Sequence, residues 1–248
     1  MKPIHNKKLI FNNFLAEDLG FIVVEGAPEI LAQENYEVVT IEGRNGGLIA
    51  NKGTYPDIEK TFTITAVDYI EDDDIEGMIN NIKKWFFNIT DNRLFYTFDN
   101  KYNIVKKVIF SEDIRTSFEE FGDFQVTFLC EPFYYAVEDT IVIEEISTTS
   151  NTVYTFNNLG DFESEPNIKL YGNGTLSFVL NDKEITVKDV MSSVEIDTKL
   201  LTCIGNSENK NRDLLVDFPT LDVGTNTIII PVGTGMIKME INPRTIYR

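Results

Sequence analysis

Few residues in this chain have the chemistry of a metal site or a nucleophilic active site. The 248-residue sequence contains one histidine, His5, and two cysteines, Cys130 and Cys203. These side chains are too few for a four-ligand Cys/His zinc site within one chain. A Ser–His–Asp or Cys–His site would have to use His5, which lies near a terminus, where chains are often poorly ordered. The two cysteines are far apart in the sequence, and we expect buried thiols rather than a disulfide framework.

Carboxylates are abundant, but their number does not define a reaction. The chain has 40 Asp and Glu residues, and a glycosidase-type acid pair needs only two at a suitable spacing, a condition that any acidic protein meets. The segment Gly43-Arg44-Asn45-Gly46-Gly47 lacks the Lys-Ser/Thr ending of a phosphate-binding loop. Asp72-Asp73-Asp74 fits either a helix N-terminus or a hard-cation site, and the absence of further ligands at calcium-loop spacing favours the helix. We therefore expect no enzyme activity, no cofactor and no metal.

The charge balance excludes other classes of protein. The formal net charge is −18, and both halves of the chain are acidic, so a dominant nucleic-acid surface or a polybasic membrane footprint is disfavoured. The early apolar run Leu9-Ile10-Phe11 is shorter than a signal peptide or a membrane span requires. We expect a protein that folds in a cytoplasm without contacting a membrane.

Strand patterns dominate the first half of the chain. Residues 61–67 alternate, with Phe62, Ile64 and Ala66 on one face. Residues 94–98 and 103–110 are typical of two strands around a short turn, and residues 124–130 alternate again. Alternation with a period of two indicates half-buried antiparallel strands.

One helix is predicted among these strands, between Asp72 and Phe87. Its apolar residues recur at spacings of three and four, which places them on a single stripe that we expect to pack in the core. The stripe consists of Ile75, Met78, Ile79, Ile82, Trp85 and Phe86.

The second half is predicted to contain only short strands and turns. A domain boundary is expected soon after Pro132-Phe133-Tyr134-Tyr135, which gives domains of residues 1–138 and 139–248. Residues 176–180 and 185–187 alternate around a turn at 181–184, and residues 227–232 and 236–241 flank Gly233-Thr234-Gly235 as a second predicted hairpin. Many short strands at this spacing suggest a β-sandwich.

Several local motifs, taken in order, resemble the distal tail protein (Dit) family of long-tailed phages of Gram-positive bacteria. No single motif is specific, and the resemblance rests on their colinearity over nearly the whole chain. In the first half they are Phe11, the turn Gly43-Arg44-Asn45-Gly46, the strand 61–67, Trp85-Phe86, residues 94–99 and residues 122–132. In the second half they are Glu165-Pro166-Asn167-Ile168, Gly172-Asn173-Gly174, Leu180-Asn181-Asp182, Ile196-Asp197, Phe218-Pro219-Thr220-Leu221, Gly224-Thr225-Asn226 and Pro243-Arg244, with Ile246 or Tyr247 where a Trp is often expected.

The resemblance implies a mainly β fold with an α+β N-terminal half: an N-terminal antiparallel β domain with one amphipathic helix, and a C-terminal galectin-like β-sandwich. It also implies a function, that of a virion structural protein at the distal end of the tail, made and assembled in the bacterial host cytoplasm. Copies of such a protein form a hexameric ring, a baseplate hub that joins the tail tube to the tail-associated lysin or hub protein, docks receptor-binding proteins and lets DNA pass through its channel without specific binding. The equivalent ring of a headless tail bacteriocin is an alternative, and an accessory carbohydrate-binding module is a third.

Sugar binding is disfavoured by the aromatic content of the second half. Galectin sites use histidine, arginine and a stacking tryptophan, and residues 139–248 contain neither His nor Trp. Tyr154, Tyr171 and Tyr247 are the aromatic platforms on which a sugar ring would have to stack, although packing in the core or at its rim is their commoner role.

Two surface segments are candidate contact sites. Gly43, Arg44, Asn45, Gly46 and Gly47, with the strands beside them, are a candidate subunit interface, although the same residues also fit an ordinary turn because Gly and Asn accept positive φ. Asn206, Asn209 and Asn211 lie in a polar loop that is a candidate site for docking a partner.

Overall fold

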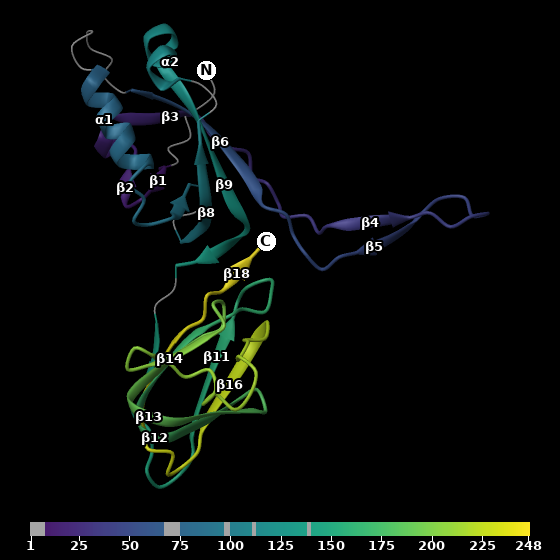
Figure 1. Ribbon diagram of the computed structural model, residues 1–248, viewed down its shortest axis with the longest axis vertical. Helices are drawn as coiled ribbons and strands as arrows, with labels where there is room; N and C mark the ends of the chain where they lie inside the picture. The colour runs from purple at the N-terminus through teal and green to yellow at the C-terminus, as the bar shows by residue number, and fades with distance from the viewer. Residues whose placement is uncertain (1–7, 67–74, 97–99, 111–112, 138–139) are drawn as a thin grey trace. The chain divides into compact units, whose positions relative to one another are not determined.

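The computed structural model describes residues 8–66, 75–96, 100–110, 113–137 and 140–248, with the side chains of 118–121 excepted (Figure 1). The chain divides into two compact units with a boundary between Tyr135 and Ala136, and Arg248 belongs to the first unit. The sequence-based boundary, between residues 138 and 139, falls on positions outside the described residues.

Unit 1 is built on an antiparallel sheet with strand order β2-β1-β7-β8-β9-β6-β3. A second, two-stranded sheet consists of β4 and β5 alone. Along the chain the elements are β1 (Ile10–Phe11), β2 (Phe14–Leu15), the 3-10 helix η1 (Glu17–Leu19), β3 (Phe21–Glu25), β4 (Tyr36–Val39), β5 (Leu48–Asn51), β6 (Ile58–Ala66), α1 (Ile75–Phe86), β7 (Arg93–Phe95), β8 (Lys101–Ile109), α2 (Ile114–Phe121) and β9 (Asp123–Ala136).

The alternating segments of unit 1 form central strands, as their pattern predicts. Phe62, Ile64 and Ala66 of β6 are buried, and β9 pairs with β6 through a ladder in which Phe62 lies opposite Val126. The predicted hairpin forms between β7 and β8, with Leu94 opposite Asn103. His5, Val67 and residues 97–99 of the sequence predictions lie outside the described residues.

The predicted helix is confirmed in α1. Ile82, Trp85 and Phe86 are buried in the core of unit 1, where the rings of Phe21 and Trp85 are stacked with centroids 5.9 Å apart. Lys83 and Lys84 lie in the last turn, where cations complement the helix dipole. Asp72-Asp73-Asp74, assigned to the start of this helix, lies outside the described residues.

A second helix, α2, was not predicted. Asp113 precedes it and accepts a hydrogen bond from the Thr116 backbone N–H at 3.0 Å, which is the usual contact of an N-cap residue. The helix is short, so it has too few turns to show a long apolar stripe.

Unit 2 is a curled antiparallel sheet around one core. Along the chain its strands are β10 (Ile141–Ile143), β11 (Thr152–Asn158), β12 (Asn167–Leu180), β13 (Lys183–Asp197), β14 (Thr202–Gly205), β15 (Glu208–Asn209), β16 (Gly224–Ile230) and β17 (Met236–Asn242). The short strand β18 (Ile246–Tyr247) is not part of this sheet. The core contains Leu176, Phe178, Ile185, Ile228 and Met239.

The long hairpin β12–β13 lies at the branch point of this sheet. The first half of β12 pairs with β17, where Ile168 lies opposite Ile241, and its last residues pair with β16, where Leu180 lies opposite Ile228. The register shifts between Gly174 and Leu176. One hairpin therefore connects the pair β10–β17 and the pair β11–β16 within a single curled sheet.

The predicted hairpin between residues 227–232 and 236–241 is wrong. Its two segments are strands, but β16 pairs with β11 and β12, whereas β17 pairs with β10 and β12. The physical reason is that β12 pairs with β17 through its first residues and with β16 through its last residues. Gly233-Thr234-Gly235 therefore connects two strands that are not hydrogen-bonded to each other. The mainly β fold class, with helix in the first half only, is confirmed. Among the described helices, none is long and apolar enough to cross a membrane.

Candidate functional site

The candidate subunit interface lies on a two-stranded arm, which we define as residues 36–51. Strands β4 and β5 pair antiparallel, with Tyr36 opposite Asn51 and Val38 opposite Ile49. The arm is a sheet of its own and does not extend the sheet of unit 1 (Figure 1). Residues 43–47 form its tip.

Both faces of the arm are exposed. Every residue of β4 and β5 is exposed, including large hydrophobic side chains. The exposed fractions of Tyr36, Val38 and Ile49 are 62%, 57% and 70%. Because residues opposite each other in a ladder share a face, Val38 and Ile49 form one apolar face, and Val39 and Leu48 lie together on the other. A lone hairpin is marginally stable in water, and exposed apolar patches commonly mark interaction sites.

The glycines at the tip have structural roles. Gly43 and Gly46 adopt positive φ (79° and 81°), and a Cβ on Gly47 would lie 2.4 Å from the Val38 Cγ1 atom. The positive φ values therefore agree with the interpretation of residues 43–47 as an ordinary turn. A contact role for the tip stays a prediction, and Arg44 and Asn45 are exposed there.

The base of the arm is closed by a polar cluster. The Asn35 backbone N–H donates to the Thr54 carbonyl and the Lys52 N–H donates to the Asn35 carbonyl, each at 2.8 Å. The Gly53 N–H donates to a Glu34 carboxylate oxygen at 2.8 Å. These contacts fix the two ends of the arm to each other and leave its apolar side chains uncovered.

The strands beside the tip were part of the interface predicted from the sequence, but neither their bounds nor their apolar faces were predicted. The signal was present, because Tyr36 to Val39 and Leu48 to Asn51 are rich in β-forming residues and flank a glycine turn. The residues named for the contact were those of the tip, 43–47. The exposed apolar side chains lie on β4 and β5.

The candidate docking loop is held by its own side chains. Asn206 and Ser207 have positive φ, as a tight hairpin turn between β14 and β15 requires. The Asn209 side chain accepts from the Asn211 N–H at 2.9 Å, and the Asn211 side chain accepts from the Cys203 N–H at 2.6 Å. Docking through this loop stays a prediction, and its asparagines have a structural role of their own.

A nearby groove does not include that loop. An open cavity of about 680 Å³ lies between the β12–β13 turn and residues 214–220. Lys183, Glu184 and Phe218 are among its lining residues, and none of Asn206, Asn209 and Asn211 is.

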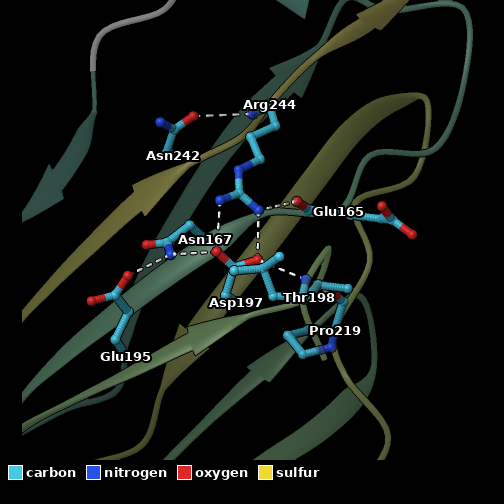
Figure 2. A network of polar contacts seen from close by, with 9 residues as sticks. Glu165, Asn167, Glu195, Asp197, Thr198, Pro219, Asn242 and Arg244 are labelled. Atoms are coloured by element: carbon cyan, nitrogen blue, oxygen red, sulfur yellow. Dashed lines mark hydrogen bonds and ion pairs between the residues drawn. The ribbon is translucent and has the colours of Figure 1, made fainter. Parts of the chain in front are cut away.

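Four of the family-like motifs of the second half meet in one polar network (Figure 2). The Arg244 guanidinium donates to both carboxylate oxygens of Asp197 at 2.7 Å and to the Glu165 carbonyl at 3.4 Å. Asn167 donates to Asp197 at 3.2 Å, and the Thr198 hydroxyl donates to the Pro219 carbonyl at 2.8 Å. The Arg244 side chain lowers the pKa of Asp197 to about 2.

This network has the properties of a structural clamp. The carboxylate oxygens of Asp197 are occupied by hydrogen bonds from Arg244, Asn167 and the Leu200 N–H. A low pKa means that the group is ionised at neutral pH and is not suited to general acid catalysis. We therefore assign these motifs to folding of unit 2.

Other motif residues have the same kind of role. Buried Asn226 accepts from the Asn181 side chain at 2.6 Å and donates to the Asp222 carbonyl at 2.8 Å. In unit 1, buried Asn12 donates to the Trp85 carbonyl at 3.1 Å and accepts from the Thr90 N–H at 2.8 Å. These asparagines supply hydrogen bonds to backbone that strands and helices leave unpaired.

Both cysteines are buried free thiols, as predicted. Burial raises the pKa of Cys130 to about 12 and that of Cys203 to about 11. Protonated thiols are poor nucleophiles and poor metal ligands. Within the described ranges, no three His, Cys, Asp or Glu side chains gather as a metal site.

The candidate sugar platforms are engaged in local contacts. The Tyr171 hydroxyl donates to Glu240 at 2.9 Å, and the Tyr154 ring lies 6.2 Å from that of Phe156. Tyr247 is half-buried on β18. These positions favour packing over stacking with a saccharide.

No protein-family model and no curated protein sequence matches the chain. Among solved structures, the chain has the fold of a phage tail-hub protein. It is similar to the crystal structure of SPP1 Dit (gp 19.1), which is described as a paradigm of the hub adsorption apparatus in phages that infect Gram-positive bacteria. The TM-score is 0.66, the identity is 17%, and the match covers 95% of this chain and 97% of the other. The fold implied by the resemblance is confirmed over nearly the whole chain.

Proposed function

We propose that the protein is a structural component of a phage tail tip, in which six copies form the ring of the baseplate hub. The observation that carries this proposal is the fold likeness to SPP1 Dit over 95% of this chain and 97% of the other. The arrangement of polar groups also supports a structural role, because motif residues such as Asn167, Asp197 and Arg244 hydrogen-bond to one another within unit 2.

The arm is the proposed contact between neighbouring copies. Its apolar side chains have no covering element among the described residues, and a closed ring needs one surface that inserts into a different surface of the next copy. Main-chain groups along β4 and β5 add directional hydrogen bonds to apolar burial. The tip, residues 43–47, would then reach furthest into the neighbour.

The ring is proposed to join the tail tube to the tail-associated lysin or hub protein and to dock receptor-binding proteins. DNA would pass through its channel. A chain with a net charge of −18 disfavours adhesion of phosphates, so acidic residues facing the channel would let DNA slide. A ring structure with a basic channel wall would contradict this part of the proposal.

The first test is the mass of the assembly formed by the full chain, alone and mixed with tail-tube or hub components. We expect hexamers, seen as rings by negative-stain microscopy. Ile49→Lys places a charge on the apolar face of the arm and should shift the population to smaller species. Because Ile49 is exposed in the protomer, the variant should keep the circular dichroism spectrum of the wild type.

A matched control is Ile237→Lys, at a residue of β17 that is 67% exposed. It should leave the ring intact, because Ile237 lies outside the arm. It therefore controls for the effect of placing a lysine at any exposed apolar position. Arg44→Glu tests the tip separately, and unchanged hexamers in that variant would remove the tip from the interface. Rings of unchanged mass in Ile49→Lys would overturn the role of the arm.

A further inference from the structure

The sheet edges of unit 2 differ in how they are protected. β10 and β15 are edge strands of three and two residues. The edge of β13 near Val187 is covered by residues 213–215, through a bridge to Leu214 and backbone hydrogen bonds on either side of it. β11 is an edge strand of seven residues that pairs only with β16. A short edge strand is a common protection against pairing with another chain, and β11 is too long to be protected in this way.

The outer edge of β11 has free main-chain groups. In the described part of the chain, the backbone of residues 152–158 makes no hydrogen bond outside its ladder with β16. Val153, Tyr154 and Thr155 are exposed, so side chains do not cover this edge. Neither proline nor lysine interrupts the strand.

The segments that form β11 and its partner strand carry no charge. Residues 146–160 and 223–237, which contain β11 and its partner β16, include no Asp, Glu, Lys or Arg, whereas 25% of the chain is charged. Edge strands are usually guarded by charges. This part of unit 2 has neither a short edge nor a charged one.

We propose that β11 is an interface for a second copy of this chain, whose β11 adds antiparallel to it. With Thr155 at the centre of the pair, Tyr154 of one copy lies opposite Phe156 of the other, and Thr155 lies opposite Thr155. Aromatic pairs and Thr–Thr pairs are among the cross-strand pairs that stabilise sheets. The strand is therefore complementary to itself in this register.

Charge argues for the same occupant. Two copies that each carry a net charge of −18 repel each other over most of their surfaces. A charge-free edge is where such copies can approach with the least repulsion. The contact is isologous, so it pairs two protomers or joins two rings face to face, and it does not depend on the arm.

The test is disulfide trapping in the full-length chain. Thr155→Cys places two thiols opposite each other at the centre of the pair and should form a covalent dimer under mild oxidation. Val153→Cys is the matched control: its residue is 61% exposed, but the two thiol positions lie about 13 Å apart along the paired strands, beyond disulfide reach. It should crosslink at least about tenfold more slowly. The native cysteines are buried and should not compete.

A second variant tests the contact without crosslinking. Thr155→Lys puts like charges opposite each other and should weaken dimerisation at least about tenfold in sedimentation. All variants are compared in the wild-type and Ile49→Lys backgrounds, so that loss of the ring and loss of β11 pairing give different results. Equal crosslinking of both cysteine variants, or no crosslinking of Thr155→Cys, would overturn the proposal. Crosslinking of Thr155→Cys only to another tail protein would refute the choice of occupant.

Discussion

The carboxylate of Asp197 is held by the Arg244 guanidinium through two hydrogen bonds of 2.7 Å, and this pairing makes folding sensitive to pH. Its pKa is about 2 in the folded protein, below the ordinary value of 3.8. A lowered pKa stabilises the fold at pH values above the unfolded pKa, and that contribution is lost as pH falls from about 4 towards 2. The size of the contribution is about 2 kcal/mol.

We expect Asp197→Asn to lower the free energy of unfolding by about 2 kcal/mol at pH 7, with the difference shrinking below about pH 4. Urea unfolding between pH 7 and pH 3 measures it. Asp182→Asn removes a carboxylate from an exposed turn and should have little effect at any pH. A loss in Asp197→Asn that does not change with pH would show that the charge of Asp197 does not contribute.

Single residues show where sequence reasoning succeeds and where it ends. The burial of Trp85 and Phe86 follows from helical spacing, because the pattern is local. The contact between Arg244 and Asp197 spans 47 positions, and no local pattern indicates which acid an arginine near the end of a chain will meet. Colinear motifs identified the fold, but their convergence at one clamp is visible only in three dimensions.

Among the elements, β16 and β17 show how a correct strand prediction can give a wrong pairing. Alternation locates both strands, and the glycines between them suggest a hairpin. The pairing is decided by β12, which pairs with β17 through residues 167–172 and with β16 through Val179 and Leu180, with a register shift of the β12–β13 ladder between these two stretches. The sequence of β16 and β17 alone does not show that both strands pair with β12.

We expect Gly172→Ala to be strongly destabilising. Gly172 has φ +155°, and a Cβ there would lie 2.4 Å from the backbone oxygen of Gly235, which cannot move without disturbing the neighbouring connection. Strain and overpacking together should cost about 3 kcal/mol or more in urea unfolding.

Gly174→Ala is the control for this substitution, because Gly174 also has positive φ, 88°, but open space around it. Only backbone strain applies there, at a cost of about 1 kcal/mol. Equal losses in the two variants would show that the close approach at Gly172 is unimportant.

At the scale of the molecule, each unit has a hydrophobic core of its own. The core of unit 2 is made from residues 143–241, and that of unit 1 from residues 9–130. A unit with a complete core can fold alone. The sequence indicates this organisation through its change from mixed to purely β patterns, whereas oligomeric state is a property of surfaces and has no periodic signal.

We therefore expect residues 136–248, expressed alone, to unfold in one cooperative transition with the same urea midpoint as unit 2 in the full chain. Circular dichroism and tryptophan fluorescence separate the two units, because the single tryptophan, Trp85, reports on unit 1. A fragment without a cooperative transition would show that unit 2 needs the rest of the chain.

The hairpin β12–β13 has a consequence for how unit 2 acquires its structure. Its two strands are joined by the turn at Asn181 and Asp182, whose positive φ values favour a tight reversal. Closing such a short loop takes microseconds, far less than bringing distant strands together. This hairpin forms between neighbouring segments of the chain, and its strand β12 then pairs with both β16 and β17. We therefore expect the hairpin to be the folding nucleus, with its amides the slowest in unit 2 to exchange with solvent.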